Sequence, residues 1–135
     1  MRVVFLCLLA AMTGIAIADD SHFANTDVFN LELAVDPQIA PDGSQVVYVR
    51  QSMDIMSDRA VANLWMVDTD GDNHRPLLSG RASYGSPRWS PDGRRLAYVS
   101  GDDNGKSQIH LRWMDTGQTA VLSNVQRSPQ SISWS

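Results

Sequence analysis

Serine and histidine are the residues of this chain that could support nucleophilic hydrolysis. A serine nucleophile on a strained strand-to-helix elbow needs the pattern Gly-x-Ser-x-Gly, because larger neighbours clash there. The nearest approach is Ala82-Ser83-Tyr84-Gly85, but Arg81 stands where the first glycine is required. The histidines at positions His22, His74 and His110 have no serine and carboxylate around them in a recognisable triad order. We therefore expect no catalytic residue in this chain, a linker around the serine, and ordinary surface or sheet-edge histidines.

An acidic run could bind a cation. Asp68-Thr69-Asp70-Gly71-Asp72 places acids at alternate positions, as the start of an EF-hand loop does. The sixth and twelfth positions are Asn73 and Ser79 instead of glycine and glutamate, and the flanking segments are typical of strands instead of helices. The run therefore predicts a solvated hairpin turn, and we expect neither a metal nor a cofactor.

The tryptophans and the overall charge exclude other ligands. Trp65, Trp89, Trp113 and Trp134 recur at fixed places in a repeat, which favours packing over stacking on sugars or bases. The net charge is −4 at pH 7 and the sequence contains no run of Lys or Arg, so nucleic acid is not an expected partner. A length of 135 residues allows one small domain or a piece of a larger one.

A repeat organises most of the chain. The stretch from Pro37 to Val49 returns as the stretch from Pro87 to Val99, and Ser131–Ser135 starts a third copy. Each full copy carries a turn in which proline presets φ and glycine accepts a positive φ. The turn residues are Pro41, Asp42 and Gly43 in the first copy, and Pro91, Asp92 and Gly93 in the second.

Each repeat unit predicts four short strands. In the second unit these are Arg88 to Ser90, Arg94 to Ser100, Ile109 to Trp113 and Thr119 to Ser123. The second strand is apolar at consecutive positions in both units, Val46 to Val49 and Leu96 to Val99, which indicates a sheet covered on both faces. The third strand alternates instead, with His110 and Arg112 on one face, and is expected to lie nearer solvent. Four-stranded units of this length are typical of β-propeller blades. We expect an all-β partial propeller with blades at 37–86 and 87–130 and the first strand of a third at 131–135.

The N-terminal residues predict export. Met1-Arg2 is followed by an apolar stretch to Ala18, with small residues at the cleavage positions Ala16 and Ala18. Residues 1–18 are thus a predicted signal peptide, and the protein is expected in the periplasm or secreted; an uncleaved anchor is the alternative. The one cysteine, Cys7, lies in this segment, so the mature chain has no thiol. Residues 19–36 are expected to hold a short helix, capped at Thr26-Asp27 and running through Val28, Phe29 and Leu31 to Leu33.

The repeat resembles a known family. Trp89-Ser90-Pro91-Asp92-Gly93, followed by Leu96-Ala97-Tyr98-Val99-Ser100, is similar to the PD40, or WD40-like, repeat of TolB and of the prolyl oligopeptidase (S9) family of serine peptidases. The stretches Asp27-Val28-Phe29, Asp36-Pro37-Gln38-Ile39 and Asn63 to Asp68 resemble the start of secreted acylaminoacyl-peptidase-like members. In the first turn Ala40 replaces the family's serine, which should remove one side-chain hydrogen bond.

The resemblance implies a propeller of about seven blades followed by an α/β-hydrolase domain with a Ser, Asp, His triad. In that case the propeller gates the access of peptide substrates to a hydrolase domain that these residues do not include, and no membrane contact follows signal cleavage. The alternative is a non-enzymatic, TolB-like periplasmic propeller that binds partner proteins. The sequence beyond Ser135 would discriminate them, since the peptidase predicts Pro-Asp-Gly, further blades and then Gly-x-Ser-x-Gly.

One loop differs between the units. Between the second and third strands the first unit has Gln51 to Asn63, and the second has only Gly101 to Ser107. The longer loop carries Met53, Ile55 and Met56. Because insertions in repeat proteins often form a binding face, we expect this loop to contact the hydrolase domain or to gate substrate entry. The alternative is a self-packed surface loop.

Overall fold

The computed structural model describes residues 24, 26–101, 105–129 and 131–135. The predicted signal peptide, Cys7 and His22 lie outside these residues. Within the described ranges, the model has no helix of the length and apolarity that a membrane crossing requires.

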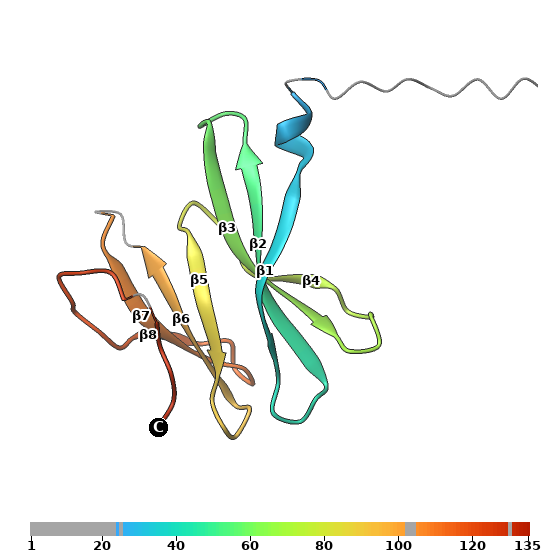
Figure 1. Cartoon of the computed structure of the whole chain (residues 1–135). Coiled ribbons are helices and arrows are strands. Elements are labelled where there is room, and N and C mark those ends of the chain that lie inside the picture. Colours follow the sequence, from blue (N-terminus) through green and yellow to red (C-terminus); the bar gives the residue numbers. More distant parts are fainter. Residues whose placement is uncertain (1–23, 25, 102–104, 130) are drawn as a thin grey trace, which may run out of the picture.

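Two antiparallel sheets of four strands each make up the structure (Figure 1), and in both the strands are ordered as in the sequence. The first sheet contains β1 (Glu32–Ile39), β2 (Gln45–Asp54), β3 (Arg59–Asp68) and β4 (Arg75–Leu78). The second contains β5 (Tyr84–Trp89), β6 (Arg95–Gly101), β7 (Ser107–Trp113) and β8 (Thr119–Val121). This architecture confirms the predicted all-β partial propeller.

The first strand of each sheet is longer than predicted. β1 and β5 begin before positions 37 and 87, where the repeat placed the blade boundaries, and Tyr84 and Gly85 lie in β5 instead of in a linker. The reason is a bulge in each strand, at which Asp36 and Ser86 both adopt a φ of 50° just before a proline. A bulge lets a strand continue through a proline that cannot donate to the ladder.

The N-terminal helix is shorter than predicted. It is a 3-10 helix, η1 (Asp27–Asn30), and Leu33 already belongs to β1 because Glu32 onward pairs with β2. Thr26 makes no side-chain cap; instead, the Asp27 carboxylate accepts a hydrogen bond of 2.7 Å from the amide of Ala24.

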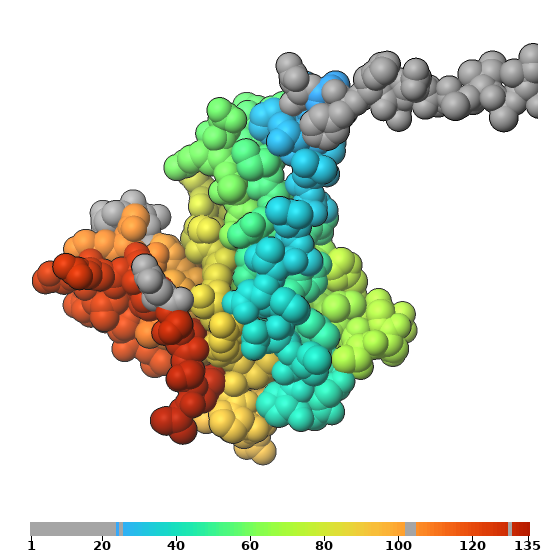
Figure 2. Space-filling view, in the orientation of Figure 1, coloured from blue at the N-terminus to red at the C-terminus, as the bar shows by residue number. Residues whose placement is uncertain are grey.

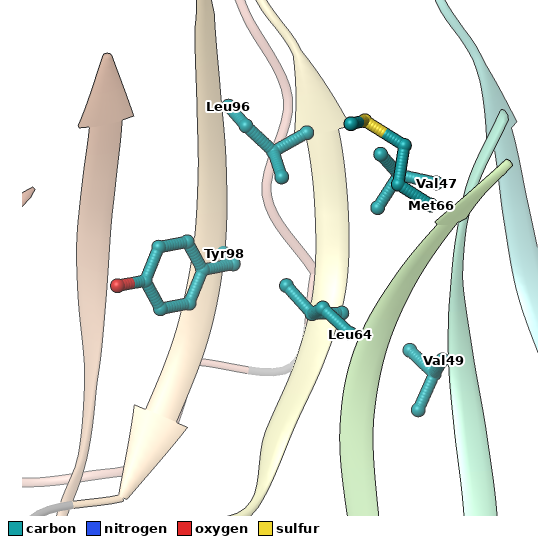
Figure 3. Packing of buried hydrophobic residues seen from close by; sticks show 6 residues of the cluster. All are labelled: Val47, Val49, Leu64, Met66, Leu96 and Tyr98. Carbon is teal, nitrogen blue, oxygen red and sulfur yellow. The ribbon is translucent and has the colours of Figure 1, made fainter. Parts of the chain in front are cut away.

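The core lies between the two sheets (Figure 3). The six buried side chains of this cluster are Val47, Val49, Leu64 and Met66 from the first sheet and Leu96 and Tyr98 from the second.

The second strand is buried on both faces in the second sheet but on only one face in the first sheet. β6 has three consecutive buried residues, Leu96, Ala97 and Tyr98, which confirms the prediction of two covered faces. β2 instead buries Val47 and Val49 while Tyr48 between them is only half-buried. Within the described ranges, the first sheet therefore has a neighbouring sheet on one face only.

The third strand of the second sheet shows the predicted alternation. His110 lies opposite Tyr98, with ring centroids 5.2 Å apart, and is half-buried. The register places His110 and Arg112 on the side of β7 that continues the Tyr98 and Leu96 side of β6, which faces the first sheet.

Residues 131–135 form no strand, although the repeat predicts the opening strand of a third blade. None of the described strands pairs with them, and a strand needs a hydrogen-bonded neighbour. They lie against the second sheet, as the red C-terminal residues in Figure 2 show, and Trp134 donates a hydrogen bond of 3.0 Å to the carbonyl of Arg88.

Candidate functional site

The two repeat turns lie side by side at one end of the sheets. Gly43 and Gly93 have φ values of 74° and 68°, the positive values that the turn chemistry predicts. A Cβ atom on Gly93 would lie 3.6 Å from Cδ of Pro41. Both turns, with Trp89 between them, line a hollow of about 370 Å³. The structure thus brings together the turn residues Pro41, Asp42, Gly43, Pro91, Asp92 and Gly93.

The turn aspartates hold the turns closed. Asp42 accepts hydrogen bonds from the Ser44 amide and hydroxyl, at 3.0 and 2.8 Å, and these bonds lower the pKa of its carboxyl. Asp92 accepts hydrogen bonds from the Ser90 hydroxyl at 2.5 Å and from the Arg94 amide at 3.0 Å. Both bonds lower the pKa of the Asp92 carboxyl, and the bond from Ser90 has the larger effect. Charged carboxylates used in this way are structural and are not poised to transfer protons.

Ser90 in the second turn makes hydrogen bonds that Ala40, its counterpart in the first turn, cannot make. Besides contacting Asp92, the buried Ser90 hydroxyl lies 3.0 Å from the Arg95 carbonyl and accepts a hydrogen bond of 2.9 Å from the Arg95 amide. The buried Ala40 therefore loses more than the one hydrogen bond that the sequence predicts. A hydroxyl both donates and accepts, which accounts for the difference.

A second hollow, of about 570 Å³, lies between the sheets. The bulge residues Asp36 and Ser86 and the linker 81–83 line it. Arg88 donates to both carboxylate oxygens of Asp36, at 3.0 and 2.9 Å, and so ties β5 to β1. No sequence pattern predicts this pair, because the two partners occupy different positions of the repeat.

The candidate nucleophile and the histidines are not brought together. Ser83 is exposed on the linker, and its carbonyl accepts a hydrogen bond of 3.4 Å from the Gly101 amide. His74 contacts the hydroxyl of Tyr48 at 2.7 Å, and His110 stacks on Tyr98. Burial lowers the pKa of His110. Among the described residues, no serine, histidine and carboxylate are joined by hydrogen bonds into a triad.

The acidic turn uses its carboxylates internally. Asp68 accepts hydrogen bonds from the side chains of Asn73, at 2.6 Å, and Gln45, at 2.9 Å, which lower the pKa of its carboxyl in that order. Asp70 accepts from the Asp72 amide at 3.0 Å. In the part of the chain that the structure describes, no group of three or more His, Cys, Asp or Glu side chains is placed to hold a metal ion.

The tryptophans divide into two groups. Trp89 donates its indole N–H to the Gln38 carbonyl at 3.1 Å, and Trp134 makes the equivalent bond to the Arg88 carbonyl, which confirms the predicted packing between repeat units. Trp113 ends β7 and is half-buried. Trp65 lies on the face of the first sheet that no other described sheet covers, and its ring centroid is 4.2 Å from the guanidinium carbon of Arg50. The strand register matches Trp65 with His110 and not with Trp113, so these two tryptophans do not occupy the same place in the repeat.

The predicted long loop is mostly a hairpin. β2 and β3 pair as far as Asp54 and Arg59, so only the tip is a turn, and Met53 is half-buried in β2. A regular hairpin satisfies the backbone hydrogen bonds that a loop would leave to water. At the tip, Ile55 is 61% and Met56 91% exposed. The Asp54 carboxylate accepts from Ser57 and the Met56 amide, which lower its pKa in that order. Figure 1 shows η1 beside this hairpin.

These features define a class of protein. Four-stranded antiparallel sheets that stack face to face are the blades of β-propellers. In this chain, an indole hydrogen bond that recurs with the repeat joins each unit to the next. Comparison with protein families specifies the class further, because the PD40 model, described as the TolB beta propeller domain, matches residues 43–135. The chain therefore belongs to the PD40 family of β-propellers.

A curated peptidase and a TolB protein are both similar to this chain in sequence. The uncharacterized peptidase YuxL of Bacillus subtilis is 29% identical over 109 residues, which are 81% of this chain and 17% of YuxL. The Tol-Pal system protein TolB of Alkalilimnicola ehrlichii is 37% identical over 76 residues, which are 56% of this chain and 17% of that protein. The chain thus spans about a sixth of the length of these curated relatives.

A solved structure shows the fold. The acylaminoacyl peptidase of Pyrococcus horikoshii superposes with a TM-score of 0.67 at 18% identity, over 79% of this chain and 16% of that one. The two sheets therefore share their fold with a part of this peptidase.

Proposed function

We propose that these residues form the N-terminal part of the propeller of an exported serine peptidase of the prolyl oligopeptidase type. One observation carries the proposal. The match to the peptidase YuxL spans 109 residues, more than the segment 43–135 contains, so it includes residues before the family repeat. The match to TolB spans 76 residues. Similarity outside the shared repeat favours the peptidase.

In this proposal the catalytic serine, aspartate and histidine belong to a hydrolase domain elsewhere in the protein. The sheets described above contribute a rigid wall, held by buried side chains and by the Arg88–Asp36 pair. A ring of such sheets surrounds a narrow central channel, which would admit extended peptides and exclude folded proteins. The propeller would then gate peptide access and would not take part in the chemistry.

The test uses the protein expressed from its complete reading frame and exported from a bacterial host. A fluorophosphonate probe, which reacts with activated serines, should label the wild-type protein but not a variant that lacks the serine of Gly-x-Ser-x-Gly. Peptide hydrolysis should be lost in the same variant. An absence of labelling in a folded, exported protein would overturn the peptidase proposal.

Export itself has a separate measurement. The predicted cleavage after Ala18 gives a mature chain that begins at Asp19. Intact mass of the exported protein should show this start. Retention of residues 1–18 would contradict the signal peptide and favour the anchor.

A TolB-like propeller that binds partner proteins is the second candidate, and the higher identity of the TolB match, 37%, favours it. A reading frame that contains further repeats and no Gly-x-Ser-x-Gly would support this candidate.

The hairpin tip is the part of the first sheet that we propose contacts the hydrolase domain or gates substrate entry. Ile55 and Met56 are exposed apolar side chains, which mark contact surfaces when they cluster, whereas Met53 supports the hairpin from within β2. The double variant Ile55→Asp, Met56→Asp should lower peptidase activity or weaken domain association. Val121→Asp adds a charge at a comparably exposed position, 60%, and should have neither effect. Unchanged kinetics and stability in the double variant would contradict the contact.

A further inference from the structure

The outer edge of β3 is open over half of its length. β4 pairs with β3 only at Leu64, Trp65 and Met66. Within the described ranges, residues 59–63 therefore have no strand beside them on the side away from β2, and we call this stretch the β3 edge. Figure 1 shows the β2–β3 hairpin extending beyond β4. A row of unpaired N–H and C=O groups is a template for the addition of another strand.

The direction of the backbone groups at the β3 edge follows from the register. The Thr69 amide donates to the Ser44 carbonyl at 3.0 Å, and β2 and β3 then pair without a bulge as far as Arg59. Backbone groups alternate in direction along an antiparallel strand, so the odd-numbered residues bond to β2. Ala60 and Ala62 direct their N–H and C=O groups to the β3 edge, and no backbone hydrogen bond among the described residues uses them. These groups are available to an added strand.

The second sheet covers the same edge with its own chain. The strand registers place Asn63 at the repeat position of Gln108. The Gln108 side chain accepts a hydrogen bond from the Val125 amide and donates one to the Val125 carbonyl, both at 3.0 Å, so the residues after β8 stay against β7. The Oδ1 atom of Asn63 is buried and has no hydrogen-bond partner among the described residues. The side-chain amide that holds the chain in the second unit therefore does not hold it in the first.

The chain leaves the β3 edge at the linker that follows β4. Counted from the last pairing of the outer strand, Arg81 is the counterpart of Val125. Gly80 before it has a φ of 152°, and the linker leads to β5 instead of following β3. Between the β3 edge and the linker 80–83 lies a hollow of about 490 Å³. The first unit thus has a gap where the second unit is closed.

The lining of this hollow has a positive charge. Arg59 and Arg81 line it, and neither forms a salt bridge among the described residues. Asp54, the one acid in the lining, already accepts hydrogen bonds from Ser57 and the Met56 amide. Two cations and one anion leave a net charge of +1, although the whole chain has −4. Guanidinium groups bind carboxylates through two parallel hydrogen bonds, so an acidic group complements this hollow.

We propose that the β3 edge binds an extended peptide segment that carries a carboxylate. The segment adds as a strand beside Ala60 and Ala62, and its carboxylate binds Arg81. The unpaired backbone groups fit an extended partner, the arginines fit an acidic one, and the hollow has the volume of a small ligand site.

The site is independent of the proposed function. Sheets that stack on the first sheet cover its faces, whereas the β3 edge lies at its rim, so further repeats leave it open. Binding requires neither a hydrolase domain nor a TolB-like partner. The reaction with the fluorophosphonate probe and the test below can therefore fail separately.

Fluorescence anisotropy with the protein from its complete reading frame tests the site. The serine of any Gly-x-Ser-x-Gly is changed to alanine, so that the protein cannot cleave the probe. The probe is fluorescein-labelled Thr-Val-Thr-Val-Glu with a free C-terminal carboxylate, because threonine and valine favour extended backbone. Arg81→Gln should weaken its binding at least about 5-fold. Arg127→Gln removes the same charge at an exposed position outside the hollow and should change the affinity less than about 2-fold.

A second comparison tests the added strand. N-methylation of alternate probe amides has two possible patterns, and only one of them removes the N–H groups that face β3. That pattern should bind about 10-fold more weakly than the other, and the comparison needs no protein variant. Ala60→Pro should weaken binding of the unmethylated probe, since proline removes an N–H at the β3 edge while the neighbouring residues keep their bonds to β2.

Four results would each overturn the proposal. They are an absence of probe binding, equal affinities for Arg81→Gln and Arg127→Gln, equal binding of the two methylation patterns, and full binding by a folded Ala60→Pro variant. Thermal unfolding shows whether that variant is folded, and the methylation patterns decide the question if it is not.

Discussion

The first and second sheets are built from the same repeat but differ in their surroundings. β6 buries Leu96, Ala97 and Tyr98 in succession, whereas β2 buries alternate residues and leaves Tyr48 half-buried. Sequence similarity along the two strands gives no hint of this difference. The comparison teaches that the repeat encodes a sheet with two apolar faces, and that only neighbouring sheets determine which faces are buried.

Substitutions at equivalent core positions should give the largest difference between the sheets. Leu96→Ala removes a fully buried side chain and should cost about 3 kcal/mol of unfolding free energy, while Val46→Ala at the same repeat position should cost under about 1 kcal/mol. Urea unfolding of the 135-residue chain measures both. Val47→Ala, which is 0% exposed on the other side of β2, controls for side-chain size and should cost more than Val46→Ala. Equal costs for the two valines would contradict the one-sided burial of β2.

The indole hydrogen bond between the sheets should give the next largest effect. Trp89→Phe leaves the Gln38 carbonyl without its donor and should cost about 1.5 kcal/mol. Trp65→Phe keeps an aromatic ring beneath Arg50 on the uncovered face and should cost less. Thermal unfolding of the two variants compares them. A Trp65→Phe variant as unstable as Trp89→Phe would show that the indole bond does not distinguish the two tryptophans.

The two turns should show the smallest difference. Ser90→Ala makes the second turn like the first and should cost about 1 kcal/mol, because the Arg95 amide loses its acceptor. It should also raise the pKa of Asp92, since the Ser90 hydroxyl is the main cause of its lowered value. NMR titration of the Asp92 carboxyl measures this shift. An unchanged pKa would mean that the Arg94 amide and the Arg95 side chain lower it without the Ser90 hydroxyl.

The sign of the pH effect follows from the same bond. A carboxyl whose pKa is lowered in the folded protein stabilises the fold above its unfolded pKa of about 3.9, and the stabilisation is lost as the pH falls through the folded pKa. Ser90→Ala should therefore make stability less sensitive to acid below about pH 4. Ala40→Ser makes the reverse change in the first turn and should lower the pKa of Asp42 further.

Much of the fold could be predicted because its signals are local. The Pro-Asp-Gly turns specify backbone dihedral angles within four residues, and Gly43 and Gly93 adopt the positive φ that these turns require. The alternation in β7 was also correct. The predicted start of β1 was too late, because Pro37 indicated the beginning of a strand. The bulge at Asp36, which the sequence does not reveal, lets the strand begin earlier.

The candidate site was predicted less completely. The lengthened connection was identified from the sequence, and its residues Ile55 and Met56 lie at an exposed tip, but Met53 is part of a strand because backbone pairing extends the hairpin. Trp65 was assigned to packing between units by its spacing, and the strand register shows that the spacing of the third strand shifts between the two repeats.

The sequence by itself determined the repeat, the strands, the turns and the absence of a Gly-x-Ser-x-Gly elbow, since each depends on residues close together in the chain. Tertiary structure alone decided that Arg88 pairs with Asp36, that Trp89 reaches the Gln38 carbonyl, and that Tyr98 is buried while Tyr48 is not. These contacts join residues about one repeat apart. A side chain's burial depends on which sheet lies against it, and that is a property of the stack of sheets and not of any single strand.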